Sequence, residues 1–369
     1  MKATPKNFRL CIVSDQLSGG GAERWAALMS CYFESQGIAV FHIIVENAVT
    51  YSYRGQLLNL GGDPNHKGIV KWIQRIKRFQ QLNTFFKNEK FDLIIDNRVK
   101  IKSIQELIIH RFVYRSPYLL MVHSFAKHLY FPQPHWISKA IYNKAKAIVS
   151  VSKAIQSSFS DDYKDTPSIV FYNPIDSVTL HQQKLEFISV SYQFILAVGS
   201  FRDNVKQFDR LVAMYAQSKL PSTDIHLIIL GDGPLRSKLQ EQIYALSCSD
   251  KIHLFGSVAN PFPYYYQALF TVLTSKFEGF PTVLIESLAI GTPVVAYDCF
   301  SGPSEIIVTE KNGLLIPDQN EKEFMIGMHR MIEDNDLYLL CKTNASQSVK
   351  HLDLPLIGKQ WIHWFYKNL

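Results

Sequence analysis

Short apolar runs alternate with stretches of helical period along most of this 369-residue chain. In residues 1–178 the pattern predicts strands at 9–14, 39–45, 91–96, 118–123, 147–151 and 168–172, and helices at 22–36 and 67–88. After a polar stretch at 177–192 the pattern restarts, with strands predicted at 194–198, 225–230, 252–255, 270–275, 293–297 and 313–316. Helices at 207–218 and 235–245 separate the first three of these strands. Continuous apolar strands between helices predict parallel sheets covered on both faces.

We therefore expect an α/β chain of two Rossmann-like, doubly wound domains that face each other across a cleft. The first domain is expected to cover residues 1–178 and the second 179–350, with the polar stretch as linker. The last segment, 351–369, carries Trp361, Trp364 and Phe365 at helical spacing, and we expect this helix to pack back on the first domain. In such folds ligands bind beyond the carboxyl ends of the strands.

The most informative segment is EGFPTVLIE, which places two carboxylates eight residues apart. Glu278 lies in a Gly/Pro turn after the strand-like run 270–275. Glu286 lies about one turn inside a helix that is expected to begin near Pro281 or Thr282 and to end near Gly291. The free N–H groups at the start of such a helix favour an anion. The segment can therefore offer backbone donors to a phosphate and carboxylates to sugar hydroxyls.

Composition and charge narrow the possible partners. The chain is 47% hydrophobic, yet no apolar run reaches the roughly 20 residues of a membrane span, and its start does not read as a signal peptide. Five cysteines are scattered singly, which argues against a zinc site or disulfides and fits the cytoplasm. Residues 1–178 carry 23 Lys and Arg against 13 Asp and Glu, whereas 179–369 carry 16 against 19. The basic first half suggests an anionic partner such as anionic lipid or lipid-linked phosphate. Nucleic acid is not expected, because no nucleic-acid motif is present.

Several motifs occur together in one order: GDGPLR, KIHLFGSVANP, FEGFPTVLIESLAIGTPVV, SGPSEII and NGLLIP between residues 231 and 317, with LSGGGAERW at 17–25. In this order they resemble family 4 of the retaining glycosyltransferases (GT4), which have the GT-B fold. The resemblance covers nearly the whole chain. It implies transfer of a sugar, with retention, from a nucleotide-diphosphate donor such as a UDP-sugar. The implied acceptor is a bacterial surface glycan: lipopolysaccharide core, capsule or a lipid-linked oligosaccharide.

The resemblance implies roles for four donor-site side chains. Lys206 and Arg202 would bind the diphosphate, Glu278 would lie beside the transferred sugar, and Glu286 would bind the ribose hydroxyls. Ser200 stands where the family usually has an arginine directly after the glycine. Arg202 would therefore reach in from two residues later, or it is an ordinary exposed arginine.

Further positions match the family less specifically. Gly279, Phe280, Pro281 and Thr282 would form a loop that binds the phosphates, and Ser257 and Val258 would contact the nucleotide base. Gly20 and Gly21, with Gly19, would lie beside the reaction centre, and His123 would lie near the sugar. Glu23 and Arg24 would face the acceptor. The glycine turn, His123 and Glu23 have plainer alternatives. Three glycines make any tight turn, a lone histidine is often structural, and a glutamate in a first helical turn suits the helix dipole.

No metal and no other cofactor is expected. The one Asp-x-Asp, Asp334-Asn335-Asp336, lies in a polar part of the late helical region and reads as a solvated turn. Three other functions stay open: a non-catalytic partner subunit that binds nucleotide sugars, an epimerase or hydrolase on the same scaffold, and, although no nucleic-acid motif is present, a protein that binds a membrane or nucleic acid. Intact Glu278, Lys206 and Glu286 weigh against the subunit, and the absence of a visible acid/base set weighs against the epimerase or hydrolase.

Two segments are candidates for contact with a membrane or acceptor. Residues 67–79 carry Ile69, Trp72, Ile73, Ile76 and Phe79 on roughly one side, with Lys71, Arg75 and Arg78 elsewhere. A basic amphipathic helix can lie on an anionic membrane, although a crossover helix packed on the sheet is the plainer interpretation. The aromatic-rich stretch 125–142 is the second candidate. A cytoplasmic protein is expected, with peripheral contact to the inner face of the cytoplasmic membrane as one option.

Overall fold

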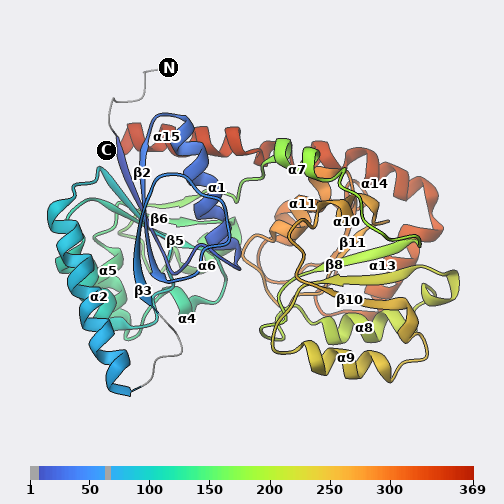
Figure 1. Ribbon diagram of the computed structural model, residues 1–369. Helices are drawn as coiled ribbons and strands as arrows, with labels where there is room; N and C mark the ends of the chain where they lie inside the picture. The colour runs from blue at the N-terminus through green and yellow to red at the C-terminus, as the bar shows by residue number, and fades with distance from the viewer. Residues whose placement is uncertain (1–7, 63–67) are drawn as a thin grey trace. The chain divides into compact units, whose positions relative to one another are not determined.

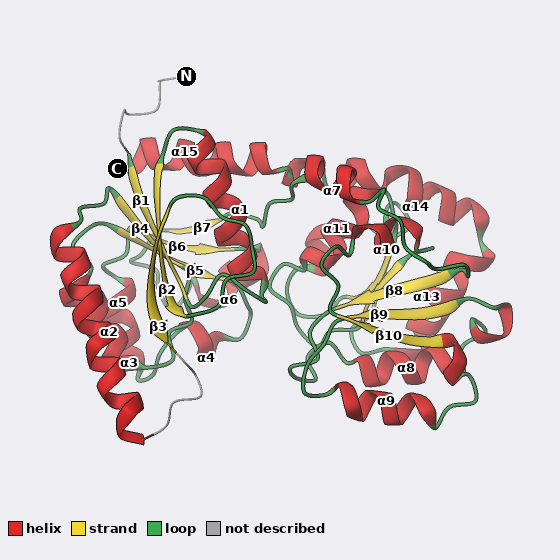
Figure 2. Ribbon diagram, viewed as in Figure 1, coloured by secondary structure: helices red, strands yellow, loops and turns green. Residues whose placement is uncertain are grey.

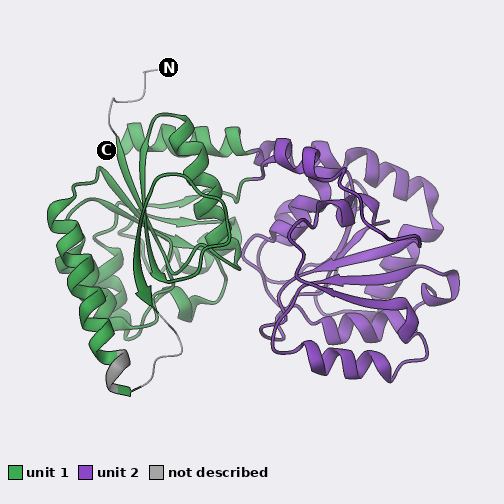
Figure 3. Cartoon of the chain, in the orientation of Figure 1, with its two compact units in different colours: residues 1–174, 354–369 green, residues 175–353 purple. Residues whose placement is uncertain are grey.

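The chain folds into two compact α/β units. The computed structural model describes residues 8–62 and 68–369. Unit 1 comprises Met1–Pro174 and Leu354–Leu369, and unit 2 comprises Ile175–Asp353 (Figure 3). The chain thus passes from unit 1 into unit 2 and returns to unit 1 at its end.

Unit 1 is built on a seven-stranded sheet in the order β3-β2-β1-β4-β5-β6-β7, and every neighbouring pair is parallel. Its strands are β1 (Arg9–Ser14), β2 (Ala39–Glu46), β3 (Gln56–Gly62), β4 (Leu93–Asp96), β5 (Tyr118–Val122), β6 (Ala147–Ser150) and β7 (Ser168–Val170). Its helices are α1 (Gly21–Ser35), α2 (Gly68–Asn88), α3 (Ser103–Ile108), a π-helical turn (Ile109–Val113), α4 (Lys127–Tyr130), α5 (His135–Tyr142), α6 (Lys153–Phe159) and α15 (Leu354–Asn368). Figures 1 and 2 show these helices around the twisted sheet.

Unit 2 holds a six-stranded parallel sheet in the order β10-β9-β8-β11-β12-β13. Its strands are β8 (Phe194–Val198), β9 (His226–Leu230), β10 (Ile252–Gly256), β11 (Thr271–Leu273), β12 (Val294–Tyr297) and β13 (Gly313–Ile316). Its α-helices are α7 (Ser177–Gln183), α8 (Phe208–Gln217), α9 (Arg236–Tyr244), α10 (Phe262–Gln267), α11 (Thr282–Ile290), α12 (Pro303–Ile306), α13 (Glu321–Glu333) and α14 (Asn335–Ser348). Short 3₁₀ turns lie at Pro221–Thr223, Ser249–Lys251 and Lys350–Leu352. The predicted double Rossmann-like α/β architecture is therefore confirmed.

The central strands are buried on both faces, which explains why they read as continuous apolar runs. Every residue of β4, β5 and β6 is buried, and so is every residue of β12. Strand β3 was not predicted, because its sequence QLLNLGG holds an asparagine and two glycines and lies at the sheet edge. Edge strands need less apolar surface than central ones, so their sequence signal is weaker.

The polar stretch at 177–192 is not a linker throughout, and that prediction was wrong for its first half. Residues Ser177–Gln183 form α7, which Asp176 caps by accepting a hydrogen bond from the Thr179 N–H at 3.1 Å. This helix packs against α10 and α11 of unit 2 and buries Leu180. One short amphipathic turn among polar residues was too weak a signal to find from the sequence.

The last helix, α15, lies beside α1 in unit 1 (Figures 1 and 2). Trp361 is fully buried between the rings of Trp25, Phe33 and Phe171, with centroid distances of 5.3, 6.4 and 4.4 Å. Trp364 makes an edge contact with Phe365. The helical spacing of these aromatic side chains is thus explained by packing on unit 1.

Part of the aromatic-rich stretch 125–142 belongs to the core of unit 1. Tyr130, Phe131 and Tyr142 are buried, and Phe131 stacks on Tyr142 and on Tyr163 at 4.9 Å each. Trp136 is the exception, with 65% of its surface exposed. The buried aromatic side chains therefore stabilise unit 1, and contact of the exposed residues of this stretch with an acceptor or membrane stays a prediction. None of the helices within the described residues combines the length and the apolar character needed to cross a membrane.

A buried histidine in β2 gives unit 1 a pH-dependent stability. Burial lowers the pKa of His42 to about 4 from its ordinary 6.5, and a backbone hydrogen bond with Arg54 only partly opposes this. Between these values the unfolded chain binds a proton that the folded chain does not, so stability is lost as pH falls from 6.5 toward 4.

We expect acidification from pH 7 to pH 5 to cost about 2 kcal/mol of unfolding free energy through His42 alone. In the His42→Leu variant this loss should shrink by that amount, because no proton is taken up on unfolding. Urea unfolding at both pH values measures it, with His363→Leu on the exposed face of α15 as control. An unchanged pH slope in His42→Leu would contradict the assignment.

Candidate active site

The candidate donor site lies at the carboxyl ends of the strands of unit 2. Strand β8 leads into the loop 199–207, and β11 leads into the loop 274–281 before α11. Two hydrogen bonds tie the loops together. Thr274 Oγ1 donates to the Lys206 carbonyl at 2.8 Å, and the Lys276 N–H donates to the Val205 carbonyl at 2.9 Å. This connection brings side chains 72 residues apart in sequence into contact.

Lys206 and Glu278 form the centre of the site. The Lys206 ammonium donates to Glu278 Oε1 at 2.5 Å, and the Ser275 hydroxyl donates to the same oxygen at 2.6 Å. The lysine and glutamate side chains are 22% and 12% exposed, so the pair is sheltered but can be reached from solvent. Lysine has three N–H donors, so Lys206 can keep Glu278 and still donate to a phosphate oxygen. The structure thus brings together two side chains that the resemblance placed in one site.

The loop before α8 is held in a strained conformation. Gln207, directly after Lys206, has φ 51° and is 1% exposed. Left-handed backbone at a residue other than glycine costs about 1–3 kcal/mol and is often found where a functional side chain must be aimed. Here it sets the direction in which Lys206 leaves the loop.

Arg202 is exposed on the same loop. Its N–H donates to the Ser200 hydroxyl at 3.2 Å, so the serine that replaces the family's arginine shapes the turn. Within residues 8–62 and 68–369 its guanidinium has no hydrogen bond or ion pair that would hold it elsewhere. Whether it contacts the donor stays a prediction.

Two glycines after β9, Gly231 and Gly233, allow close packing against the loop 199–207. A Cβ at Gly231 would collide with the Gly199 carbonyl, and a Cβ at Gly233 would lie 2.6 Å from the Phe201 carbonyl carbon. The Phe201 N–H donates to the Asp232 carbonyl at 2.9 Å, which joins the two loops. GDGP is therefore a packing motif that supports Arg202 and Lys206 without contributing chemistry. Ser257 and Val258 follow β10 at the next loop, exposed and half-buried respectively.

Helix α11 begins and ends where the sequence predicted, and anion binding at its start stays a prediction. Pro281 is its N-cap, Thr282 begins it, and Gly291 ends it with φ 100°. No side chain caps its first turn, so the N–H groups of Thr282 and Val283 remain available to an anion. Gly302, with φ 102°, allows the loop after β12 to approach, since a Cβ there would lie 2.5 Å from the Pro281 ring. Ser301 donates to the Gly279 carbonyl at 2.8 Å and fixes the turn that holds Phe280.

Glu286 is more enclosed than a solvated helix face would be. It is 4% exposed, and its Oε2 accepts a hydrogen bond from the Tyr265 hydroxyl of α10 at 3.1 Å. A buried carboxylate requires such partners. Tyr265 therefore orients the carboxylate, and the role of Glu286 toward ribose stays a prediction.

The loops of unit 1 hold the remaining predicted residues. Gly19 (φ 81°) and Gly20 follow β1, and Gly20 is the N-cap of α1, before Gly21. The Glu23 carboxylate folds back over Gly20. It lies so close that a Cβ at this glycine would collide with Glu23 Oε2. This position favours the alternative that Glu23 supports the start of the helix. Arg24, one residue on, is half-buried.

His123 follows β5 and contacts Asn97, which follows β4. The Asn97 amide donates to the Ala22 carbonyl at 2.9 Å, which leaves its Oδ1 to accept from His123 Nε2. Burial, with a smaller effect from Lys100, lowers the pKa of His123 to about 3, so the ring is neutral at physiological pH. Asn97 was missed by the sequence reasoning, although a polar residue directly after a buried strand is a usable signal.

Behind Asn97 lies a buried ionic cluster. Arg98 Nη2 donates to Asp96 at 2.7 Å and to Glu106 at 2.9 Å. Burial alone would raise the pKa of Asp96, but Arg98 and Lys100 outweigh it and hold the pKa well below its ordinary range. Asp96, Glu106 and His110 are grouped closely enough to hold a metal ion, yet Arg98 already bridges both carboxylates. The cluster therefore supports the 96–98 turn.

The second acidic candidate for a metal site was Asp334. It caps α14 in an exposed turn by accepting a hydrogen bond from the Leu337 N–H at 3.0 Å.

Two family models match the chain. The model described as Glycosyltransferase Family 4 matches residues 19–178, and the model described as Glycosyl transferases group 1 matches residues 181–348. The chain belongs to glycosyltransferase family 4. Each model covers one of the two Rossmann-like halves, so the family assignment spans both sheets.

Two bacterial glycosyltransferases are among the similar curated proteins. One is the N-acetylgalactosamine-N,N'-diacetylbacillosaminyl-diphospho-undecaprenol 4-alpha-N-acetylgalactosaminyltransferase of Campylobacter jejuni, 35% identical over 221 residues, which are 59% of this chain and 60% of that protein. Another is the lipopolysaccharide 1,6-galactosyltransferase of Escherichia coli, 40% identical over 93 residues, which are 24% of this chain and 26% of that enzyme. These likenesses span less than two thirds of either relative.

Solved structures of the GT-B fold match almost the whole chain. HepE of Anabaena in complex with UDP superimposes with a TM-score of 0.76 at 18% identity, covering 98% of this chain and 100% of HepE. Sucrose-phosphate synthase of Thermosynechococcus elongatus gives a TM-score of 0.79 at 18% identity, covering 98% of each chain. At these identities the likeness establishes the GT-B fold and nothing finer.

Proposed function

We propose that this family 4 member transfers a sugar, with retention, from a UDP-sugar to a bacterial surface-glycan or lipid-linked acceptor, without a metal ion. The observation that carries the proposal is the Lys206–Glu278 pair beside the uncapped start of α11. A cation and free backbone donors there suit a diphosphate, and a carboxylate beside them suits a sugar. Solved proteins of the same fold that hold UDP support the choice of donor.

Charge stabilisation would supply the chemistry. As the bond from C1 to the diphosphate breaks, negative charge grows on the leaving phosphate. The Lys206 ammonium, the N–H groups of Thr282 and Val283 and the exposed Arg202 would stabilise it, since preorganised donors act most strongly where charge develops. Glu278 would stabilise the positive charge that develops at C1. The acceptor oxygen then bonds to C1 from the same face, and its proton passes to the leaving phosphate oxygen.

The acceptor class is inferred from relatives and from charge. The Campylobacter relative acts, by its name, on a sugar carried by diphospho-undecaprenol, and the Escherichia coli relative acts on lipopolysaccharide. Both acceptors are anionic lipid glycans, and residues 1–178 of this chain are strongly basic. We therefore propose that unit 1 receives a lipid-linked glycan and that the protein contacts the membrane peripherally.

Chelation tests the metal-free mechanism. We expect turnover of the preferred nucleotide sugar, found by a thermal-shift panel, to be unchanged by excess EDTA, because Lys206, Arg202 and α11 supply the positive charge that a metal would otherwise provide. Complete loss of activity on chelation, restored by a divalent ion, would contradict the proposal.

Glu286→Ala should weaken UDP binding by about 10- to 100-fold, because hydrogen bonds to a charged acceptor contribute roughly 1.5–3 kcal/mol each. Isothermal titration calorimetry measures the affinity, and Tyr265→Phe, which keeps the carboxylate, should lose far less. The melting temperature is followed in parallel, since Glu286→Ala leaves the buried Tyr265 hydroxyl without this acceptor. Unchanged UDP affinity in the folded variant would remove Glu286 from the ribose site.

A further inference from the structure

A groove of about 700 Å³ lies on unit 1, and its lining residues differ from those discussed so far as donor ligands. Helices α2 and α3 form its two sides, and the carboxyl ends of β2 and β3 lie at its base, where Val45, Glu46, Leu60 and Gly62 line it. Figure 2 shows α2 and α3 on the same side of the unit 1 sheet. Parallel strands end at one edge of a sheet, so the groove opens at the same edge as the loops that follow β1 and β4.

Large apolar side chains line both helical sides of the groove and remain exposed. On α2 these are Trp72, 62% exposed, and Ile76, 38% exposed; on α3 they are Ile104, 70% exposed, and Ile108, 37% exposed. If α2 were only a crossover helix packed on the sheet, as the plainer interpretation of the sequence predicts, this face of the helix would be buried. That interpretation therefore does not explain why these apolar side chains are exposed. The side chains of Ile69 and Lys71, and Lys67 itself, lie outside the described residues. Contiguous apolar surface of this kind marks a binding site.

Cations lie within the same groove. Arg75 and Arg78 of α2 and Lys102 before α3 line it, against one carboxylate, Glu46, among the described lining residues. Arg98 also lines the groove, but Asp96 and Glu106 neutralise it. Arg75 and Arg78 are three residues apart on one helix, so their guanidinium groups can meet neighbouring phosphoryl groups. Gly62 makes room for Arg78, because a Cβ there would collide with its Nη1.

We propose that this groove binds the diphosphate and the adjoining isoprenoid units of a polyprenyl-diphosphate-linked acceptor. Arg75 and Arg78 hold the diphosphate, while Trp72, Ile76 and Ile104 contact the hydrocarbon chain. A bounded groove with cations between apolar sides suits one anionic head with one attached chain, whereas a flat basic face would suit a bilayer surface. The inference rests on the proposed function and names the class of its acceptor.

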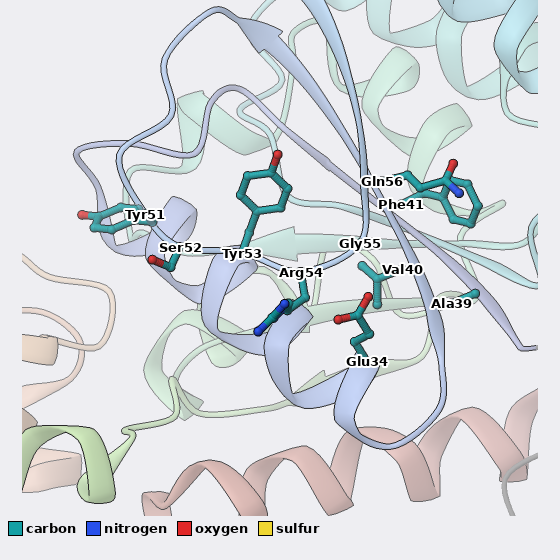
Figure 4. A pocket seen from close by; sticks show the side chains of 10 residues that line it. All are labelled: Glu34, Ala39, Val40, Phe41, Tyr51, Ser52, Tyr53, Arg54, Gly55 and Gln56. Carbon is teal, nitrogen blue, oxygen red and sulfur yellow. The ribbon is translucent and has the colours of Figure 1, made fainter.

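A second hollow of unit 1 does not share these features. It has a volume of about 760 Å³ and lies at the amino ends of β2 and β3, where Ala39 and Gln56 line it. Figure 4 shows Tyr51, Ser52, Tyr53 and Arg54 entering it from one loop and Glu34 from α1. It lies at the sheet edge opposite the loops after β1 and β4, and one arginine and one glutamate, Arg54 and Glu34, line it. The α2–α3 groove is therefore the better candidate for the acceptor.

Binding of undecaprenyl diphosphate in detergent micelles tests the proposal. The change in tryptophan fluorescence on binding should disappear in Trp72→Phe. The double variant Arg75→Glu with Arg78→Glu should lose affinity by about tenfold or more, because charge-assisted contacts become repulsive. The matched control is Lys77→Glu, which changes charge on the same helix but lines a different surface, beside Leu58 and Gln80. Ile104→Asp should likewise weaken binding, and Ile326→Asp, at an isoleucine of α13 that is also exposed (48% against 70% for Ile104), should not.

Two further measurements separate the outcomes. Undecaprenyl monophosphate should bind several-fold more weakly than the diphosphate. On phosphatidylglycerol vesicles the loss of binding free energy should follow the number of reversed charges, so that the double arginine variant loses about twice as much as Lys77→Glu. Wild-type affinity for the diphosphate probe in the double variant would overturn the proposal. So would a loss that is larger on vesicles than on the probe, because the groove would then be a general membrane contact. UDP affinity is measured on each variant: absence of UDP binding in the wild type would refute the proposed function while leaving the groove result to stand on its own.

Discussion

The Glu278→Gln variant is expected to lose about 100- to 1,000-fold in turnover number while its UDP affinity changes by less than about threefold. The amide keeps an oxygen that can accept from Ser275 and Lys206, so the loop 274–281 should stay in place. It removes the negative charge that would balance positive charge at C1 of the sugar. An interaction made chiefly in the transition state affects the rate more than binding. Initial-rate kinetics and calorimetry with UDP give the two quantities.

The control for this variant is Glu323→Gln, an exposed glutamate in the first turn of α13, which should behave as wild type. A wild-type turnover number in Glu278→Gln would remove Glu278 from the reaction. Equal losses in turnover and in UDP affinity would assign it to donor binding instead of to the charge at C1.

Lys206→Ala is expected to lower kcat/KM by about 1,000-fold and to weaken UDP binding by about tenfold or more, because a charge-assisted donor to the diphosphate is lost in both ground and transition states. A second effect adds to the first. Lys206 and Ser275 both donate to Glu278, whose side chain is 12% exposed. When the ammonium is removed, the Ser275 hydroxyl is the one of these two donors that remains. An unpaired carboxylate would then face the diphosphate and repel it.

Lys276→Ala is the matched control, since this exposed lysine lies in the neighbouring loop and contributes only its N–H to the contact with Val205. Compared with Lys206→Ala, Lys206→Arg should recover part of the UDP affinity, because the positive charge is kept. It should recover less of the turnover number, because a guanidinium cannot occupy the position of the ammonium beside Glu278. If Lys206→Ala binds UDP as tightly as wild type, the diphosphate does not lie at this lysine.

The strands were largely predictable because a strand that is buried on both faces consists of consecutive apolar residues. Predicted strands at 9–14, 194–198 and 313–316 coincide with β1, β8 and β13, and the predicted end of α11 at Gly291 is confirmed by its positive φ. Elements that bury little were not predictable. Strand β3 and helices α3 and α7 are short and carry few buried apolar residues, so local sequence does not distinguish them from loops.

The site was predictable only in part. Glu278 and Lys206 were singled out through the family resemblance, and their contact is a finding of the structure. Ser275, Tyr265 and Asn97 were not singled out, although each holds a predicted residue in position. Their roles come from neighbours that are distant in sequence, and a single sequence holds no record of such proximity.

By itself the amino-acid sequence determined the alternation of strands and helices, the restart of that pattern, the GT-B family and the segment that carries two carboxylates. These follow from local periodicity and from contiguous motifs, which are properties of neighbouring residues. Tertiary structure alone decided that Lys206 meets Glu278, that Tyr265 encloses Glu286, and that the apolar side chains of α2 face those of α3 across a groove with two arginines. Each of these is a contact between segments that packing of the sheets brings together, and such contacts depend on the path of the whole chain.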